Sequence, residues 1–145
     1  MPSKKIEDAV SELQKAWPKI VEMFEILQPG FTLILTCTHR LPEEQRELFK
    51  QGRTFGKDNK VIHIDSSKIV TNCDGFNVLS PHNYYPTKAI DVCVVSKATG
   101  KVFWTPDLYF PLLKICEQLN LMSGGNWKSI KDWPHIEIHN YREHS

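Results

Sequence analysis

Short apolar runs, separated by unequal stretches of chain, constrain the fold more than any other feature of this sequence. Three runs are typical of strands because they are rich in β-branched residues or alternate in polarity: 31–37, 88–95 and 135–139. Two segments carry apolar residues at helical spacing, 5–27 and 106–120. A third helix is predicted at 41–52, because Pro42 suits a first turn, two glutamates follow it and Gly52 suits a helix end. Helices and strands do not alternate regularly, as they would around a parallel sheet. The order therefore predicts an α+β domain with a small, largely antiparallel sheet flanked by helices.

Prolines and glycines add detail to these segments. Pro18 predicts either a kink in the first helix or the start of a second helix. Pro111 lies within the second turn of the last helical segment, and residues 101–104 follow a Thr-Gly turn and form a further strand. We also expect a hairpin within 61–72 and a loop at 123–127.

The composition indicates one domain over residues 1–145. Hydrophobic residues make up 41% of the chain, which is enough for a real core. The 18 basic and 17 acidic side chains leave a net charge of +1, which gives no support for a protein that binds nucleic acid. No apolar run approaches the roughly 18 residues of a spanning helix, so we expect no membrane insertion. A monomer is expected.

Two further features concern the compartment and the redox state. The first ten residues, MPSKKIEDAV, carry basic side chains but no apolar segment of the kind found in secretory signals. We therefore expect the protein to be cytoplasmic when it is made. The cysteines lack the C-x-x-C spacing of zinc ribbons and thioredoxin-like motifs, which favours ordinary buried thiols. They are Cys37, Cys73, Cys93 and Cys116.

Two histidines and an aspartate are candidate metal ligands. Asp91 lies near the start of one predicted strand, His135 begins another, and His82 lies nine positions before Asp91 in a loop rich in Pro and Tyr. Neighbouring strands stand about 4.8 Å apart, so side chains on one sheet face can share an ion. Imidazoles and a carboxylate are good zinc donors, and three protein ligands leave a fourth position open. Spacing alone favours the other interpretation, an unrelated loop His and strand-edge Asp, because a His and an Asp nine positions apart form a weak pattern.

A second acid lies close to the last candidate ligand. Asp132 precedes His135 by three residues, across Trp133 and Pro134. A carboxylate held near a metal site can take a proton from water and pass it to a leaving amine. The other interpretation is a loop Asp in ordinary turn chemistry, and spacing alone favours it.

Three sequence blocks together resemble the VanY-like D,D-carboxypeptidase and L-alanyl-D-glutamate peptidase superfamily of zinc peptidases. The first is S-x-H-N-x-x-P-T-x-A-x-D at 80–91, and the second is G-G-x-W-K-S-x-K-D-x-P-H at 124–135. The third, TCTHRLPEEQRELFKQGRT at 36–54, is similar to the family segment T-x-x-x-R-x-x-x-x-Q. The blocks occur in the family's order and span most of the chain. The resemblance implies a Hedgehog/DD-peptidase-like fold.

The resemblance also implies a role for each matching residue. His82, Asp91 and His135 match the three ligands of a Zn²⁺ ion, and Asp132 matches the catalytic acid/base. Arg40 matches an arginine that stabilises an oxyanion or grips a substrate carboxylate; a solvated surface arginine is the alternative.

Other matches are weaker, and two features depart from the family pattern. Ser80 and Gln45 fall at motif positions and are expected to contact substrate, and Tyr84 is expected to line the cleft. Many members have a shorter His-to-Asp gap with a glycine in it, so the loop here is a lengthened version over the same ligands. Carboxypeptidase members often carry Glu near the last His, whereas Asp132 suits the endopeptidase branch.

The implied function is that of a zinc metallopeptidase, a single catalytic domain over residues 1–145 that acts on the stem peptide of peptidoglycan. The expected activity is that of an L-alanyl-D-glutamate endopeptidase, working as a bacteriophage endolysin. It would reach the cell wall after release, through a holin-type pore. A D,D-carboxypeptidase or D,D-dipeptidase on the same scaffold is the enzyme alternative. A non-catalytic, zinc-containing binding module is the other.

Overall fold

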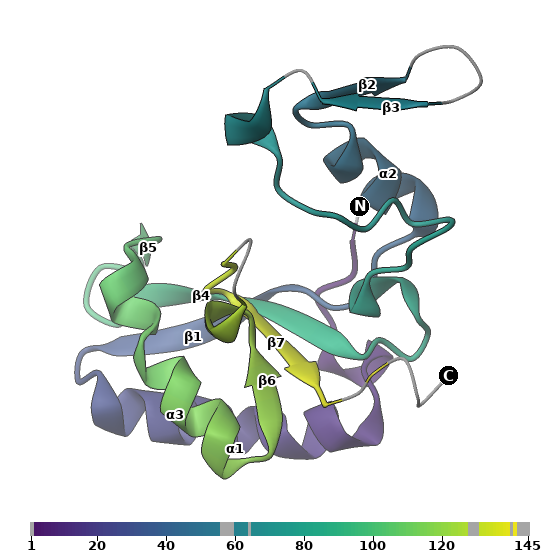
Figure 1. Cartoon of the computed structure of the whole chain (residues 1–145). Coiled ribbons are helices and arrows are strands. Elements are labelled where there is room, and N and C mark those ends of the chain that lie inside the picture. The colour runs from purple at the N-terminus through teal and green to yellow at the C-terminus, as the bar shows by residue number, and fades with distance from the viewer. Residues whose placement is uncertain (1, 56–59, 64, 128–130, 140, 142–145) are drawn as a thin grey trace.

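An antiparallel sheet forms the centre of the computed structural model, which describes residues 2–55, 60–63, 65–127, 131–139 and 141 (Figure 1). Within those residues the sheet has five strands in the order β1-β4-β7-β6, and β5 pairs with the other part of β4. Their bounds are β1 (Phe31–Cys37), β4 (Ala89–Ser96), β5 (Val102–Phe103), β6 (Leu121–Ser123) and β7 (His135–Ile138). The prediction of an α+β fold with a small antiparallel sheet is confirmed.

Two helices, α1 (Ser11–Leu27) and α3 (Pro111–Gln118), bury one face of this sheet. Successive residues of a strand point to opposite faces, so alternate positions of the central strands meet the helices. Ile90 and Val92 of β4, and Ile136 of β7, are fully buried in this core. The intervening positions, including Asp91 and His135, therefore belong to the opposite face, where the candidate site lies.

The first helix differs from its predicted extent. Pro18 lies inside α1 and starts no second helix. The break occurs earlier, where the short η1 (Ile6–Asp8) ends and Ala9 forms a parallel bridge with Thr87. The Val10 N–H donates to the Thr87 carbonyl at 2.9 Å, so backbone pairing with the loop before β4 replaces the expected first helical turns.

The predicted helix 106–120 is also divided. Residues 106–109 form a separate 3-10 turn, η5 (Pro106–Tyr109), and Pro111 occupies the first turn of α3 rather than its second turn. Proline lacks an N–H and clashes with the carbonyl four residues before it, so it suits a helix start. The fully buried Tyr109 fixes the junction, because its hydroxyl donates to the Phe103 carbonyl at 2.6 Å.

The hairpin expected within 61–72 was predicted in the wrong place. β3 (Val61–His63) pairs instead with β2 (Arg53–Phe55), and η3 (Ser66–Lys68) follows. Arg53 explains the path of the remaining residues, since its guanidinium donates to the Phe49 carbonyl at 2.9 Å and the Thr71 carbonyl at 2.7 Å. These bonds draw the segment around Thr71 towards α2 (Pro42–Phe49) and away from β3.

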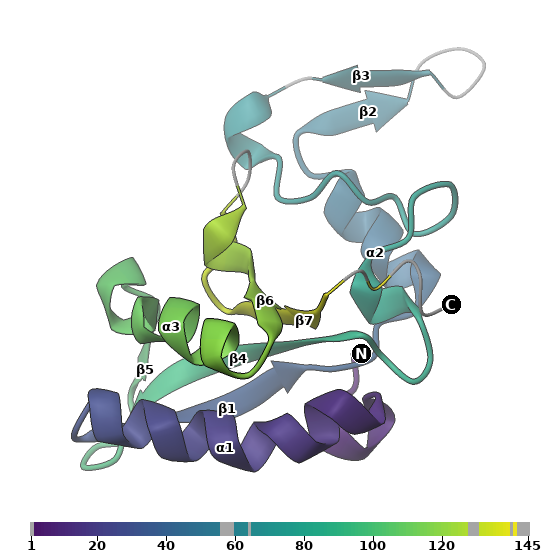
Figure 2. The ribbon, with the colours of Figure 1, turned by 60° about the horizontal axis from the view of Figure 1, so that its bottom comes forward.

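The second layer lies on the far side of the sheet from α1 (Figure 1, Figure 2). It contains α2, β2 and β3, and the hairpin lies farthest from α1 in both views. The strand β6 was not predicted; it has three residues and passes into η6 (Gly124–Asn126), where a loop was expected. Among the described residues, no helix combines the length and apolar character needed to cross a membrane.

Candidate metal centre

One row of side chains crosses three neighbouring strands at the end of the sheet. Asp91 of β4 pairs with Cys37 of β1 on one side and with His135 of β7 on the other. Directly paired residues share a sheet face, so all three side chains point towards the second layer. The predicted ligands Asp91 and His135 are therefore fixed by strand register.

The third predicted ligand comes from the loop before β4. His82 lies in η4 (Pro81–Asn83), a 3-10 turn whose start is capped by Ser80. The Ser80 hydroxyl accepts the His82 N–H at 3.2 Å, and the Asn83 side-chain amide donates to the Arg40 carbonyl at 2.9 Å. This capped turn buries the His82 ring and directs it at the strand row.

The donor atoms of the three residues form a nearly equilateral triangle. His82 Nε2 and His135 Nδ1 each lie 3.2 Å from Asp91 Oδ1, and the two nitrogens are 3.3 Å apart. Tetrahedral zinc with bonds of about 2.0–2.1 Å requires donors about 3.3–3.4 Å apart. The donor set and its spacing therefore fit a zinc ion with a fourth position left open.

Each imidazole is oriented by a hydrogen bond from its other ring nitrogen. His82 Nδ1 lies 2.7 Å from the Thr38 carbonyl, which only accepts, so Nδ1 carries the proton and Nε2 faces Asp91. His135 Nε2 lies 2.8 Å from Glu137 Oε1, which leaves its Nδ1 towards Asp91. Such outer hydrogen bonds fix the tautomer and orientation of metal-binding histidines.

The electrostatics of the triangle favour a proton shared among its three side chains. Burial opposes a charge on His82, but the adjacent Asp91 carboxylate outweighs burial and raises the pKa of His82 to about 10. Burial likewise opposes the charge on Asp91, yet the two imidazoles hold the pKa of Asp91 well below its usual range. Without a metal, a proton is therefore held where zinc would bind, and zinc binding would release it.

Asp132 lies beside the triangle. It offers a carboxylate oxygen within 4.8 Å of the ligand atoms of Asp91 and His135. Burial raises the pKa of Asp132, and the charge of Asp91 raises it further. Its backbone is held against Gly124, where an added Cβ would come within 2.2 Å of the Asp132 carbonyl oxygen. The glycine therefore allows the turn that carries the acid to approach the metal site.

The Arg40 guanidinium lies between Asp91 of the candidate site and Gln45 of α2. Its Nη1 donates to Gln45 Oε1 at 2.8 Å, and its Nη2 lies 3.5 Å from Asp91 Oδ2. Only 14% of the Arg40 side chain is exposed, so it is not a solvated surface arginine. Gln45 is buried and also donates to Thr71 Oγ1 and the Cys73 carbonyl, so it ties Arg40 to the second layer.

Of the two remaining residues predicted to contact substrate, Ser80 lines the cleft and Tyr84 does not. Ser80 lines the cleft, although its hydroxyl already accepts the His82 N–H. Tyr84 is not among the described residues that line the cleft; its ring packs edge-on against Tyr141, which is one of them. Tyr85 is largely exposed, and its hydroxyl donates to Asp8.

An open cleft of about 740 Å³ lies between the sheet and the second layer. The sheet contributes Asp91, His135 and Glu137, and the second layer contributes Gln45 and residues 70–73. The three candidate ligands and Asp132 thus line a cleft with room for an extended peptide.

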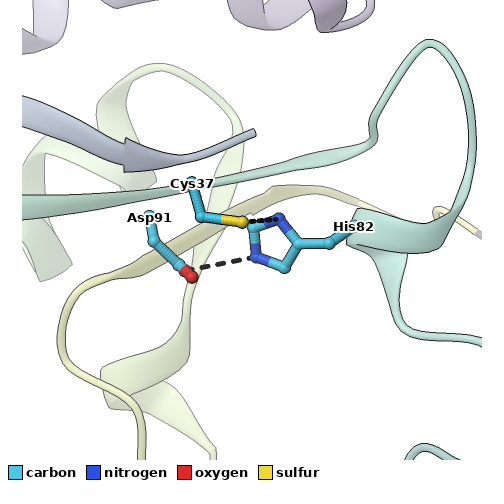
Figure 3. A group of neighbouring side chains, drawn as sticks. All are labelled: Cys37, His82 and Asp91. Atoms are coloured by element: carbon cyan, nitrogen blue, oxygen red, sulfur yellow. Dashed lines mark hydrogen bonds and ion pairs between the residues drawn. The ribbon is translucent and has the colours of Figure 1, made fainter. Parts of the chain in front are cut away.

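Sequence reasoning missed one member of the site. Cys37 was expected to be an ordinary buried thiol, yet its sulfur groups with His82 and Asp91, as Figure 3 shows. Strict alternation along β1 would point Cys37 into the core beside Leu35. A bulge between Leu35 and Cys37 shifts the register, and no sequence signal marks it.

Comparison with known proteins was made with family models, curated sequences and solved structures. No protein-family model matches the chain. The peptidoglycan L-alanyl-D-glutamate endopeptidase CwlK of Bacillus subtilis (strain 168) is 31% identical over 118 residues. The match spans 75% of this chain and 62% of that relative, so the chain covers less than two thirds of its length.

The similarity to CwlK supports the resemblance of the sequence motifs to the VanY-like D,D-carboxypeptidase and L-alanyl-D-glutamate peptidase superfamily. Among solved structures, the L-Ala D-Glu endopeptidase ChiX of Serratia marcescens aligns with a TM-score of 0.52 and 18% identity. That alignment covers 94% of this chain and 91% of ChiX, which shows that the two share a fold.

Proposed function

We propose that this chain is a peptidoglycan peptidase and, more narrowly, a zinc-dependent L-alanyl-D-glutamate endopeptidase. The observation that carries the proposal is the triangle of His82 Nε2, Asp91 Oδ1 and His135 Nδ1, with the Asp132 carboxylate beside it in an open cleft. The names of CwlK and ChiX support the choice of bond.

His82, Asp91 and His135 would hold the zinc ion, which supplies Lewis acidity to the scissile carbonyl and to a water molecule. Asp132 takes a proton from that water as the water oxygen bonds to the carbonyl carbon. The amide C–N bond then breaks, and Asp132 passes the proton to the leaving amine nitrogen. A raised pKa suits this role, because the group must both accept and return a proton.

Arg40 is placed to meet negative charge on the substrate. Its guanidinium can stabilise the oxyanion that forms as the carbonyl is attacked, or bind the free α-carboxylate of D-glutamate. Gln45 holds this guanidinium at the cleft wall, so we assign Gln45 to the binding of substrate through Arg40. Ser80 would act similarly through His82, which it positions.

Digestion of purified sacculi by zinc-loaded protein, followed by mass analysis of the new ends, tests the proposal. The expected products are new L-alanine carboxyl ends and D-glutamate amino ends, with little free D-alanine. Release of D-alanine as the main product would instead establish a D,D-carboxypeptidase. A zinc-loaded protein that binds sacculi without cutting them would establish a binding module.

The cellular setting remains a prediction of the sequence. We propose a monomer of one catalytic domain over residues 1–145, acting on the stem peptide as a bacteriophage endolysin after release through a holin-type pore. The product analysis above does not depend on that setting.

A further inference from the structure

Cys37 reaches the candidate site through an irregularity in β1. Leu35 pairs with Val92, and the next pairing joins Cys37 to Asp91, so Thr36 is the extra residue of a bulge. Without the bulge, Thr36 would lie opposite Asp91 and the cysteine would face the core. The backbone therefore departs from regular pairing at the one position that brings a thiol to the metal ligands.

The Cys37 sulfur touches groups on two sides of the site. Arg40 Nη2–H donates to the sulfur at 3.5 Å, and His82 Nδ1 lies 3.7 Å from it. Figure 3 shows one nitrogen of the His82 ring facing the sulfur and the other facing the Asp91 carboxylate. The thiol proton is directed to the Thr38 carbonyl at 3.8 Å, which leaves the sulfur free to accept from Arg40.

We propose that Cys37 is a positioning residue, which holds the Arg40 guanidinium at the edge of the metal site. Among the described residues, three side chains hold the Arg40 guanidinium. Gln45 holds Nη1, Asp91 Oδ2 attracts Nη2, and the Cys37 sulfur accepts from Nη2 from the side of β1. Asp91 Oδ1 faces the two imidazoles, so Asp91 Oδ2 and the Cys37 sulfur are the groups that hold Nη2.

Serine would not replace the thiol fully. Its hydroxyl oxygen is bonded closer to Cβ than a sulfur atom is, so it would fall short of Nη2. The buried Cys37 also fills space against the His82 ring, which a smaller side chain would leave empty. The size of sulfur, together with its weak acceptor character, thus suits a contact at 3.5 Å.

The inference rests on the proposed peptidase function only for its kinetic readout. Cys37→Ala should lower kcat/KM by about tenfold, the effect of losing one hydrogen bond to a charged group. The loss should fall on the same parameter, kcat or KM, that Arg40→Ala changes. In an Arg40→Ala background, Cys37→Ala should have almost no further effect on kcat/KM. An equal fold-loss in both backgrounds would overturn the inference.

A second measurement needs no substrate. The free energies of unfolding of the two single variants and the double variant should be non-additive. Cys93→Ala is the matched control, because Cys93 is a buried thiol two residues beyond Asp91 on the same face of β4. Its effect should add to that of Arg40→Ala. Additive energies for Cys37 and Arg40 would sink the proposal even if sacculi were never cleaved.

Cobalt substitution separates positioning from direct ligation. The visible spectrum of the cobalt protein should be the same in the wild type and in Cys37→Ala. It should lack the near-ultraviolet charge-transfer band of a thiolate bound to cobalt. If the wild type shows that band and Cys37→Ala loses it, Cys37 is a metal ligand and the positioning role is wrong.

Discussion

The two walls of the cleft are held in place in different ways. On the sheet side, strand register sets the positions of Cys37, Asp91 and His135, and a continuous core packs behind them. On the other side, the second layer depends on a few side-chain hydrogen bonds from Gln45 and Arg53.

The exposure of apolar side chains also differs between the two walls of the cleft. The core-facing residues of β4 and β7 are fully buried, whereas Val61, Ile62 and Val70 of the second layer are nearly half exposed. Each large buried apolar side chain stabilises a fold by about 1.5–3 kcal/mol, so most of the stability should lie on the sheet side. The comparison teaches that the candidate metal ligands and the proposed substrate contacts are held by separate parts of the fold, so a substitution should be able to affect one without the other.

Removing a metal ligand should have the largest effect. His135→Ala or His82→Ala leaves two donors, so we expect the loss of bound zinc and of all measurable peptidase activity. Elemental analysis of untagged protein gives the metal content. His63→Ala is the control, since His63 is exposed on β3 and should not change the one zinc per chain expected for the wild type. Equal zinc in all four proteins would contradict the ligand assignment.

Removing the proposed base, Asp132, should lower peptidase activity without changing zinc binding, although both depend on the sheet side of the cleft. Asp132→Asn keeps the shape of the side chain but cannot take a proton, so activity should fall on the order of a hundredfold or more. Zinc content and the melting temperature should be preserved. Asp107→Asn, at an exposed position in η5, should change none of the three quantities. Near-normal cleavage of sacculi by Asp132→Asn would remove Asp132 from its role.

A substitution in the second layer should have a smaller effect on activity and should also lower stability, without changing the zinc content. Gln45→Ala removes the acceptor of Arg40 Nη1 and the donor to the Cys73 carbonyl, so kcat/KM should fall by about tenfold and stability by about 1–3 kcal/mol. Zinc content should stay at the wild-type value, because strand register holds the ligands.

The control for this substitution is Gln14→Ala. Gln14 donates its amide to the Ala9 carbonyl at 2.9 Å, on the far side of the molecule from the cleft, so kcat/KM should be unchanged. If Gln45→Ala also lost its zinc, the two walls would not be separable and the comparison would be wrong.

The same division explains what the sequence could predict. Alternation in HIEIH and the apolar run before Val95 indicate the strands, and the motif resemblance supplies His82, Asp91 and His135. The second layer has weak periodicity, so its hairpin was predicted in the wrong place. The buried Arg53 determines the path there through contacts with residues distant in sequence. The bulge that places Cys37 also depends on tertiary pairing.

The last effect that we predict concerns pH, and His82 and Asp91 on the sheet side should carry it. In the metal-free protein the pKa of His82 is raised from 6.5 to about 10, so the charged imidazole stabilises the folded state fully below about pH 6.5. That contribution is lost as the pH rises towards 10. Asp91 works in the opposite direction: its lowered pKa gives stability that is present above about pH 3.8 and lost as the pH falls. The metal-free protein should therefore be most stable between these limits, and its melting temperature should fall above about pH 6.5.

Zinc should remove that fall in melting temperature, because it binds neutral imidazoles and releases the proton. The difference in melting temperature between zinc-loaded and chelator-treated protein should widen as the pH rises from about 6.5 to about 9, over which the imidazole proton is progressively lost. Asp91→Asn removes the charge that raises the pKa of His82, so it should flatten the pH dependence of the metal-free protein. Gln45 and Arg53 do not titrate in this range, so Gln45→Ala should shift the whole curve downwards without changing its slope. A slope that changes with Gln45→Ala but not with Asp91→Asn would place the pH-sensitive contacts in the second layer, contrary to the division drawn here.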